Sequence, residues 1–174
     1  TALARVEGEV WNEMYFSRYP NNLLLLLLES ALIKIHNMVG ILPKEYAGFS
    51  PAEKLDQLRS KLKELGCTAQ FVGKLDNLAW LLNLRAMDIE CTPYAMAYCY
   101  VTPDRAVLFI HTARVTPEAK AELEANGVIL AEYDSVLDFM AAETEPQTVL
   151  ADPASVNFAV YETLQNNAAL TVKD

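Results

Sequence analysis

Side chains that could bind a metal ion or activate a nucleophile are sparse in this sequence of 174 residues. The two histidines, His36 and His111, lie far apart along the chain. Asp88 and Glu90 would point to the same side of an extended segment, because successive side chains of a strand alternate. A pair of carboxylates without a third convergent ligand is more typical of a solvated loop than of a metal site. The sequence therefore predicts no catalytic residue and no metal ligand in this chain.

The cysteine and glycine patterns argue against two further kinds of site. Cys67, Cys91 and Cys99 form an odd set without C-x-x-C spacing, which disfavours a disulfide framework and favours a reducing, cytoplasmic location. The apolar neighbours of Cys99 predict a buried, unreactive thiol. The six glycines are scattered and form neither a G-x-G-x-x-G motif nor a Walker loop, so no phosphate-binding loop is predicted.

The most distinctive polar residues follow a strongly apolar stretch that ends at Leu82. Asp76 is expected to cap a short helix there by accepting hydrogen bonds from backbone N–H groups. Asn83 and Arg85 come directly after this helix, and a polar side chain in such a place must be solvated, paired or directed at another surface. An exposed arginine commonly has no special role. Alternatively, the Arg85 guanidinium could clamp a loop through Asp88 or pair across an interface.

Tyrosines mark the strand that is predicted over residues 94–101. Tyr94, Tyr98 and Tyr100 are spaced at even intervals and would share one face of this strand. That face could belong to the core, with its hydroxyl groups reaching solvent, or it could be a surface against which another domain packs. The residues alone leave both interpretations open.

Helices and strands alternate over the rest of the chain. A capping box at Ser50–Glu53 opens a helix that Gly66 is expected to end in the left-handed conformation. Further helices are predicted from Thr116–Pro117 to Gly127, over residues 135–142, and after a cap at Asp152–Pro153. Strands are predicted over residues 67–73, 94–101, 106–111, 128–133, 148–150 and 168–172, with a hairpin between the second and the third. This order predicts an α/β fold in which helices flank a mixed β-sheet.

Composition and charge bound the range of functions. A net charge of −9 with 52% hydrophobic residues suits a soluble globular domain and disfavours binding to nucleic acid or to an anionic membrane. The leucine run Leu23–Leu28 is too short to span a bilayer, which needs about 20 apolar residues. Acidic residues precede this run, unlike the basic lead of a secretory signal. We expect residues 1–43 to be the partly helical end of a preceding segment and residues 44–174 to be the α/β domain.

From Tyr46 onward, several spaced motifs resemble the creatinase/prolidase amino-terminal domain, in particular the middle domain of three-domain Xaa-Pro aminopeptidases. The most specific is Leu75–Arg85, which is similar to the LDEIAWLLNLRG segment of that family. Departures are concentrated after Arg85, where the family usually has Gly-Ser and this chain has Ala86-Met87. The other matching positions, in chain order, are Tyr46–Ser50, Lys54-Leu55, Leu58-Arg59, Pro93, Tyr98, Val107–Ile110, Asp152-Pro153, Val156-Asn157 and Tyr161.

This resemblance implies a ribonuclease H-like architecture and a parent enzyme that removes the amino-terminal residue preceding a proline. It also implies that two divalent, manganese-type metal ions belong to a carboxy-terminal metallopeptidase domain absent from this chain. The present domain would then be non-catalytic, would pack beside that domain and an amino-terminal one, and would favour short proline-containing peptides by narrowing access. The resemblance also implies that the parent enzyme is cytoplasmic. It allows a homodimer as the assembly of that enzyme. The residues expected to face the neighbouring domain are Asn83, Arg85, Asp88, Pro93 and Tyr98.

A different class of function is a free-standing α/β module that binds a small ligand or a protein. It predicts a closed pocket near the tyrosine strand. A creatinase-like enzyme that acts without a peptidase domain is the third hypothesis, and it fails for lack of catalytic groups.

Overall fold

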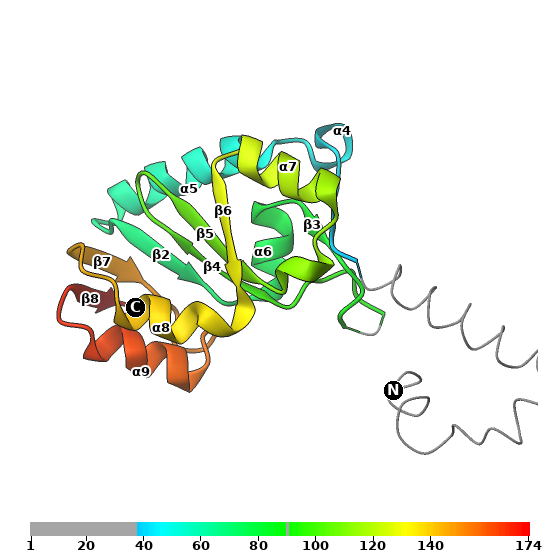
Figure 1. Cartoon of the computed structure of the whole chain (residues 1–174). Coiled ribbons are helices and arrows are strands. Elements are labelled where there is room, and N and C mark those ends of the chain that lie inside the picture. Colours follow the sequence, from blue (N-terminus) through cyan, green and yellow to red (C-terminus); the bar gives the residue numbers. More distant parts are fainter. Residues whose placement is uncertain (1–37, 90) are drawn as a thin grey trace, which may run out of the picture. The chain divides into compact units, whose positions relative to one another are not determined.

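The computed structural model describes residues 38–89 and 91–174 of the chain (Figure 1). Val39–Asp174 form one compact unit, in which Val39 is buried. This unit includes the short strand β1 (Gly40–Ile41), which the expected boundary at residue 44 placed outside the α/β domain. The leucine run Leu23–Leu28, and the helical part expected before residue 44, lie outside the described residues.

A six-stranded sheet forms the centre of the unit, in the order β6–β5–β4–β2–β7–β8. Strand β4 is antiparallel to both of its neighbours, β2 and β5, and the other neighbouring strands are parallel. The mixed sheet and the β4–β5 hairpin that the sequence predicts are therefore confirmed. The six strands are β2 (Ala69–Val72), β4 (Ala97–Val101), β5 (Ala106–Ile110), β6 (Val128–Glu132), β7 (Gln147–Leu150) and β8 (Leu170–Lys173).

A second, two-stranded sheet lies outside the central one. It pairs β1 with β3 (Leu84–Arg85) in antiparallel fashion, Gly40 opposite Arg85 and Ile41 opposite Leu84. The sequence pattern did not predict either strand, because each is only two residues long and has no alternation to detect.

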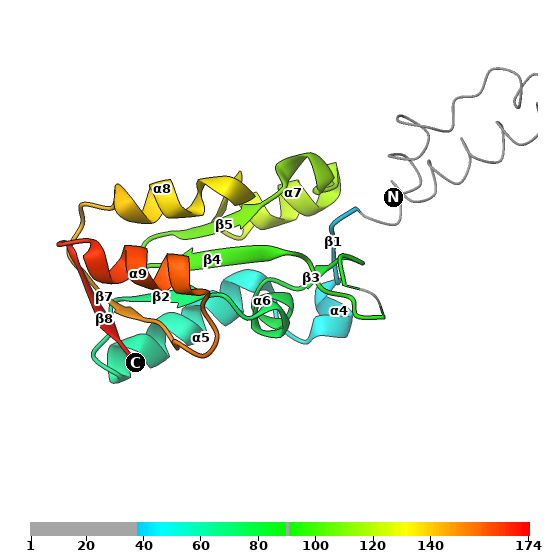
Figure 2. The ribbon, with the colours of Figure 1, turned by 90° about the horizontal axis from the view of Figure 1, so that it is seen from below.

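Helices cover both faces of the central sheet. One face carries α5 (Pro51–Glu64), α6 (Leu75–Leu81) and α7 (Pro117–Ala125). The other carries α8 (Val136–Ala141) and α9 (Phe158–Asn166). Figure 2 shows the sheet between α8 on one side and α5 and α6 on the other. A further short helix, α4 (Lys44–Ala47), precedes α5.

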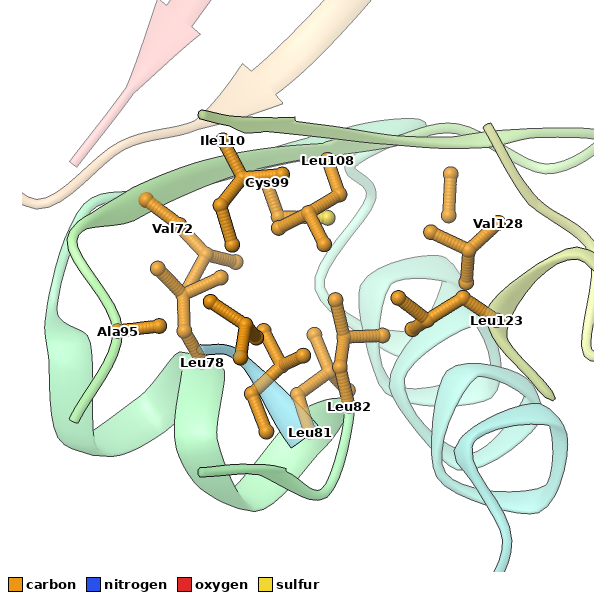
Figure 3. Close-up of a cluster of buried hydrophobic side chains, with 14 of the residues drawn as sticks. Val72, Leu78, Leu81, Leu82, Ala95, Cys99, Leu108, Ile110, Leu123 and Val128 are labelled. Atoms are coloured by element: carbon orange, nitrogen blue, oxygen red, sulfur yellow. The ribbon is translucent and has the colours of Figure 1, made fainter. Parts of the chain in front are cut away.

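Two hydrophobic cores, one on each face, hold these layers together. Leu78, Leu81 and Leu82 at α6 pack toward Cys99 and other side chains of β4 and β5 (Figure 3). The second core joins the opposite faces of the same strands to α8 and α9. Every residue of β5 is buried, which explains why its sequence is a continuous apolar run rather than an alternating one.

Several helix ends follow the sequence prediction. The Ser50 side chain accepts a hydrogen bond from the backbone of Glu53, and the Glu53 side chain accepts one from the backbone of Ser50, so the capping box is present. Thr116 caps α7 through the backbone N–H of Ala119. Gly66 and Gly127 have φ angles of 68° and 77°, the left-handed conformation expected at the ends of α5 and α7.

Two predicted caps are wrong. Helix α6 starts at Leu75, so Asp76 lies inside its first turn, where it accepts a bond from its neighbour Asn77. Helix α9 starts at Phe158 and is capped by Asn157. Asp152 instead accepts hydrogen bonds from Ala154 and Ser155 in the preceding turn. Both errors have one cause, since short polar side chains stabilise turns as readily as helix starts.

The burial of side chains in the first core, between α6 and the sheet, can be tested by substitution. Leu82 is fully buried, and we expect Leu82→Ala to lower the free energy of unfolding by about 2–5 kcal/mol, because the substitution leaves a cavity. Urea unfolding measures the change. Leu137→Ala is the matched control, since Leu137 is 38% exposed on α8 and should cost much less. Equal costs at the two positions would contradict this core.

Candidate functional site

Lys54 on α5 lies at the centre of the polar contacts around the Leu75–Arg85 motif. Its side chain is buried, and its ammonium donates hydrogen bonds to Trp80 O at 2.7 Å and to Asn83 Oδ1 at 2.6 Å. The ammonium also lies 4.6 Å from the centre of the Trp80 ring. Burial, and secondly the charge of Arg85, lower the pKa of Lys54. Lys54 thus ties α5 to the carboxyl end of α6, where unpaired peptide carbonyls favour a cation.

Asn83 receives this bond in an unusual backbone conformation, with a φ angle of 56°. Asparagine tolerates the left-handed region better than most residues, and here it turns the chain from α6 into β3. Its Nδ2 donates to Phe49 O at 3.0 Å, and its backbone carbonyl accepts from Leu42 N at 2.8 Å. Asn83 is only 2% exposed, so its side chain is engaged inside the domain and presents no surface to a neighbour.

Arg85 lies at the end of β3 and is partly exposed. Its Nη1 donates to Ala79 O at 2.9 Å and to Leu84 O at 2.6 Å. The clamp between Arg85 and Asp88 that the sequence allowed is not formed. The Asp88 carboxylate pairs with Arg114 instead, because the chain after β5 brings that guanidinium to the same place.

Asp88 anchors the loop of residues 86–96. Its side chain is 3% exposed and, besides binding Arg114, accepts a hydrogen bond from Met96 N at 2.7 Å. Its backbone N–H donates to Tyr94 O at 3.2 Å, which closes the loop on itself. Tyr94 therefore belongs to this loop and not to β4, which starts at Ala97.

The same loop exposes apolar side chains around this buried anchor. Met87, Ile89 and Met96 are each about two fifths exposed, and Pro93 is also at the surface. Methionine side chains are flexible and suit contact surfaces that must adapt to a partner. The loop thus combines a fixed base with an apolar, adaptable outer surface.

Tyr98 stands at the start of β4 among other polar aromatic residues. Its hydroxyl accepts hydrogen bonds from Asn157 Nδ2 at 2.7 Å and from Tyr133 at 3.3 Å, and its ring stacks on Tyr133. Burial and the bond to Tyr98 raise the pKa of Tyr133 to about 12. His111 packs against Tyr133, with its ring centre 5.0 Å from that of Tyr133.

These four residues lie at the carboxyl edge of the sheet. His111, Tyr133 and Asn157 follow the carboxyl ends of β5, β6 and β7, and the antiparallel β4 begins there. Ligands and partners of open α/β sheets commonly bind at this edge. Of the four, sequence reasoning placed only Tyr98 at a functional surface. His111 and Tyr133 end the strands predicted over residues 106–111 and 128–133, which is the signal that could have found them. No such signal marks Asn157.

The tyrosine face is partly as predicted. Tyr98 and Tyr100 pack on the same side of β4, and Cys99 packs on the other. Tyr100 is fully buried, so it belongs to the core and not to a surface.

The side chains at these places make hydrogen bonds, one ion pair and apolar contacts. Within residues 38–89 and 91–174, no group of three or more His, Cys, Asp or Glu side chains is placed to hold a metal ion. A surface groove of about 610 Å³ lies at β6, lined in part by Thr112, Lys120 and Ile129, and not at the tyrosine strand. In the described part of the chain, no helix is long and apolar enough to cross a membrane.

Comparison with known proteins places this geometry in a family. Residues 34–174 match the family model of the creatinase/prolidase N-terminal domain. The chain belongs to this family. The mixed sheet flanked by helices is accordingly the fold of the creatinase/prolidase N-terminal domain, as the motifs around Leu75–Arg85 implied.

The relatives are aminopeptidases. Aminopeptidase P2 of Arabidopsis thaliana is 36% identical over 140 residues, which are 79% of this chain and 19% of that protein. A probable Xaa-Pro aminopeptidase P of Metarhizium acridum (strain CQMa 102) is 38% identical over 111 residues, 63% of this chain and 18% of that protein. This chain therefore spans about a fifth of the length of these curated relatives.

A solved structure shows the same fold in such an enzyme. The X-prolyl aminopeptidase of Caenorhabditis elegans, described as a cytosolic enzyme with a di-nuclear active site, superimposes with a TM-score of 0.71 at 27% identity. The similarity covers 78% of this chain and 23% of that one. This creatinase-type domain is thus similar to one part of a longer enzyme.

The buried carboxylate of Asp88 gives a prediction for the loop. Asp88→Asn should lower the free energy of unfolding by about 1.5–3 kcal/mol, since Arg114 and Met96 N lose a charged acceptor. Limited proteolysis should also cut residues 86–96 faster. Asp134→Asn is the control, because Asp134 is exposed. Unchanged stability and cleavage in Asp88→Asn would show that the ion pair does not hold the loop.

The three cysteines should differ sharply in reactivity. Burial raises the pKa of Cys99 to about 12, so this thiol stays protonated and inaccessible in the folded protein, whereas Cys91 is exposed. We expect a thiol reagent to label Cys91 in the native protein, and Cys67 and Cys99 only after unfolding. Raising the pH from about 8 to about 9 should not accelerate labelling of Cys99 in the folded protein. Fast native labelling of Cys99, measured by peptide mass spectrometry, would contradict its burial.

Proposed function

We propose that this chain is the middle, creatinase-type domain of a longer Xaa-Pro aminopeptidase, and that it is itself non-catalytic. The observation that carries the proposal is its similarity, at 36% identity, to about a fifth of Aminopeptidase P2 of Arabidopsis thaliana. The parent enzyme would be cytoplasmic and would hydrolyse the bond between an amino-terminal residue and a following proline. Its chemistry would be metal-assisted hydrolysis by two divalent, manganese-type ions.

The side chains of this domain support a non-catalytic role. Three of the polar residues described above are occupied within the fold: Lys54 by Asn83, Asp88 by Arg114, and Tyr98 by Asn157 and Tyr133. Metal ligands would then come from the metallopeptidase domain beyond this chain. The domain contributes shape and contact surface instead.

In this proposal, the domain packs beside the metallopeptidase domain and restricts access to its active site. Two surfaces suit such packing, namely the loop of residues 86–96 and the carboxyl edge with Tyr98 and His111. Asp174 also lies at this edge of the sheet, where the Tyr161 hydroxyl donates to its carboxylate at 2.9 Å. A polypeptide that continued beyond Asp174 would leave the domain here, close to the proposed contact surface. Excluding longer chains in this way would favour short peptides.

The division of labour can be tested with two proteins. We expect the isolated chain to show no manganese-dependent release of the first residue from an Xaa-Pro peptide, and the complete polypeptide to show it. Turnover that co-purified with the isolated chain would contradict the non-catalytic role. A complete polypeptide without this activity would contradict the parent enzyme.

Access restriction predicts a second effect in the complete polypeptide. Asp88→Asn loosens the proposed covering loop, so kcat/KM for long Xaa-Pro peptides should rise relative to kcat/KM for tripeptides. The exposed control Glu64→Gln, at the end of α5 that precedes β2, should leave this ratio unchanged. An unaltered ratio in Asp88→Asn would contradict a gating role for the loop.

A further inference from the structure

Arg85 retains hydrogen-bonding capacity that the domain does not use. A guanidinium can donate from all of its nitrogens, and Arg85 donates only from Nη1, to Ala79 O and Leu84 O. Its Nε and Nη2 have no acceptor among residues 38–89 and 91–174. Asp88, three positions along the chain, is already bound by Arg114. The remaining donors of Arg85 are therefore open to an acceptor from outside the domain.

The surroundings of Arg85 are aromatic and exposed. Trp80 is 54% exposed and follows Ala79, whose carbonyl Arg85 binds. Phe49 is 49% exposed, and its carbonyl is held by Asn83, the residue that turns the chain toward Arg85. Tryptophan and arginine are among the residue types most enriched at the centres of protein interfaces.

The local charge selects the kind of partner. Arg85 lies close enough to Lys54 for its charge to affect that ammonium, and neither cation is paired with a carboxylate in the described part of the chain. This positive site lies in a chain whose net charge is −9. A carboxylate is its complement, since a guanidinium binds carboxylates through two parallel N–H···O bonds.

We infer that Arg85 binds an aspartate or glutamate side chain of the metallopeptidase domain of the same polypeptide, with Trp80 and Phe49 packing around the ion pair. This inference rests on the proposed function and names the contact through which the two domains join. Lys54 and Asn83 are positioning residues, because they fix the end of α6, which carries Trp80, and the turn that leads to Arg85 on β3. The buried ion pair would exclude water from the contact and set the orientation of the neighbouring domain.

Side-chain footprinting with hydroxyl radicals tests the inference, with peptide mass spectrometry as the readout. In the isolated chain Trp80 should be oxidised readily, and in the complete polypeptide severalfold more slowly. Arg85→Met should restore fast oxidation of Trp80 in the complete polypeptide. Arg85→Lys keeps the positive charge but cannot form two parallel hydrogen bonds to a carboxylate, so this variant should restore fast oxidation of Trp80 only in part.

Arg59→Met is the matched control. Arg59 is also partly buried and donates to a backbone carbonyl, Thr102 O at 3.0 Å, but it lies away from Trp80 on α5. The Arg59→Met variant should leave the protection of Trp80 in the complete polypeptide unchanged. Thermal unfolding of the isolated variants shows whether each still folds, so that a loss of protection is not mistaken for unfolding.

Two results would overturn the inference. Equal oxidation of Trp80 in the isolated chain and in the complete polypeptide would place the interdomain contact elsewhere. Protection that persists in Arg85→Met would show that the face is covered without an ion pair to Arg85. Peptidase activity is measured separately. If the complete polypeptide is active and gives either of these results, only the Arg85 contact is refuted. If the complete polypeptide is inactive but Trp80 protection still depends on Arg85, the contact is supported and the proposed function is refuted.

Discussion

The buried ammonium of Lys54 is the constraint on which the end of α6, strand β3 and the loop of residues 86–96 depend. A cation removed from water must have its hydrogen bonds satisfied, and here Trp80 O, Asn83 Oδ1 and the Trp80 ring satisfy them. Because these acceptors sit at the end of α6 and in the turn that follows, the requirement fixes both against α5. Strand β3 and the loop of residues 86–96 continue directly from this turn. The Lys54 interaction thus fixes the place from which the segment of residues 83–96 begins.

A second buried charge holds the far end of the same segment. Asp88 is bound by Arg114 and by Met96 N, so the loop has a fixed base, while Met87, Ile89 and Met96 remain at its surface. This arrangement uses the strong polar groups for internal order and leaves apolar and aromatic groups outside. Such a division suits the contact surface that we propose for this domain.

The sequence predicted the architecture well and the polar partners poorly. Capping chemistry at Ser50 and Thr116, and the continuous apolar run of β5, depend on residues close together in the chain, so they could be predicted directly. The partner of Asp88 could not be predicted in this way, because Arg114 follows β5 and lies 26 positions further along the chain, whereas Arg85 is much nearer in sequence. Burial of Asn83 was missed for the same reason, since Lys54 lies 29 positions away. The motif resemblance did not distinguish an inward-facing residue of this segment, such as Asn83, from an outward-facing one, such as Trp80.

The central claim is that this domain acts through a surface that another domain of the same polypeptide covers. A structure of the complete polypeptide tests it most directly, through the distance from the Arg85 guanidinium to the nearest carboxylate oxygen outside this domain. The account predicts a hydrogen-bonded pair there, with the Trp80 ring buried against the neighbouring domain. An Arg85 guanidinium surrounded by solvent, with Trp80 and the loop of residues 86–96 still exposed, would contradict it.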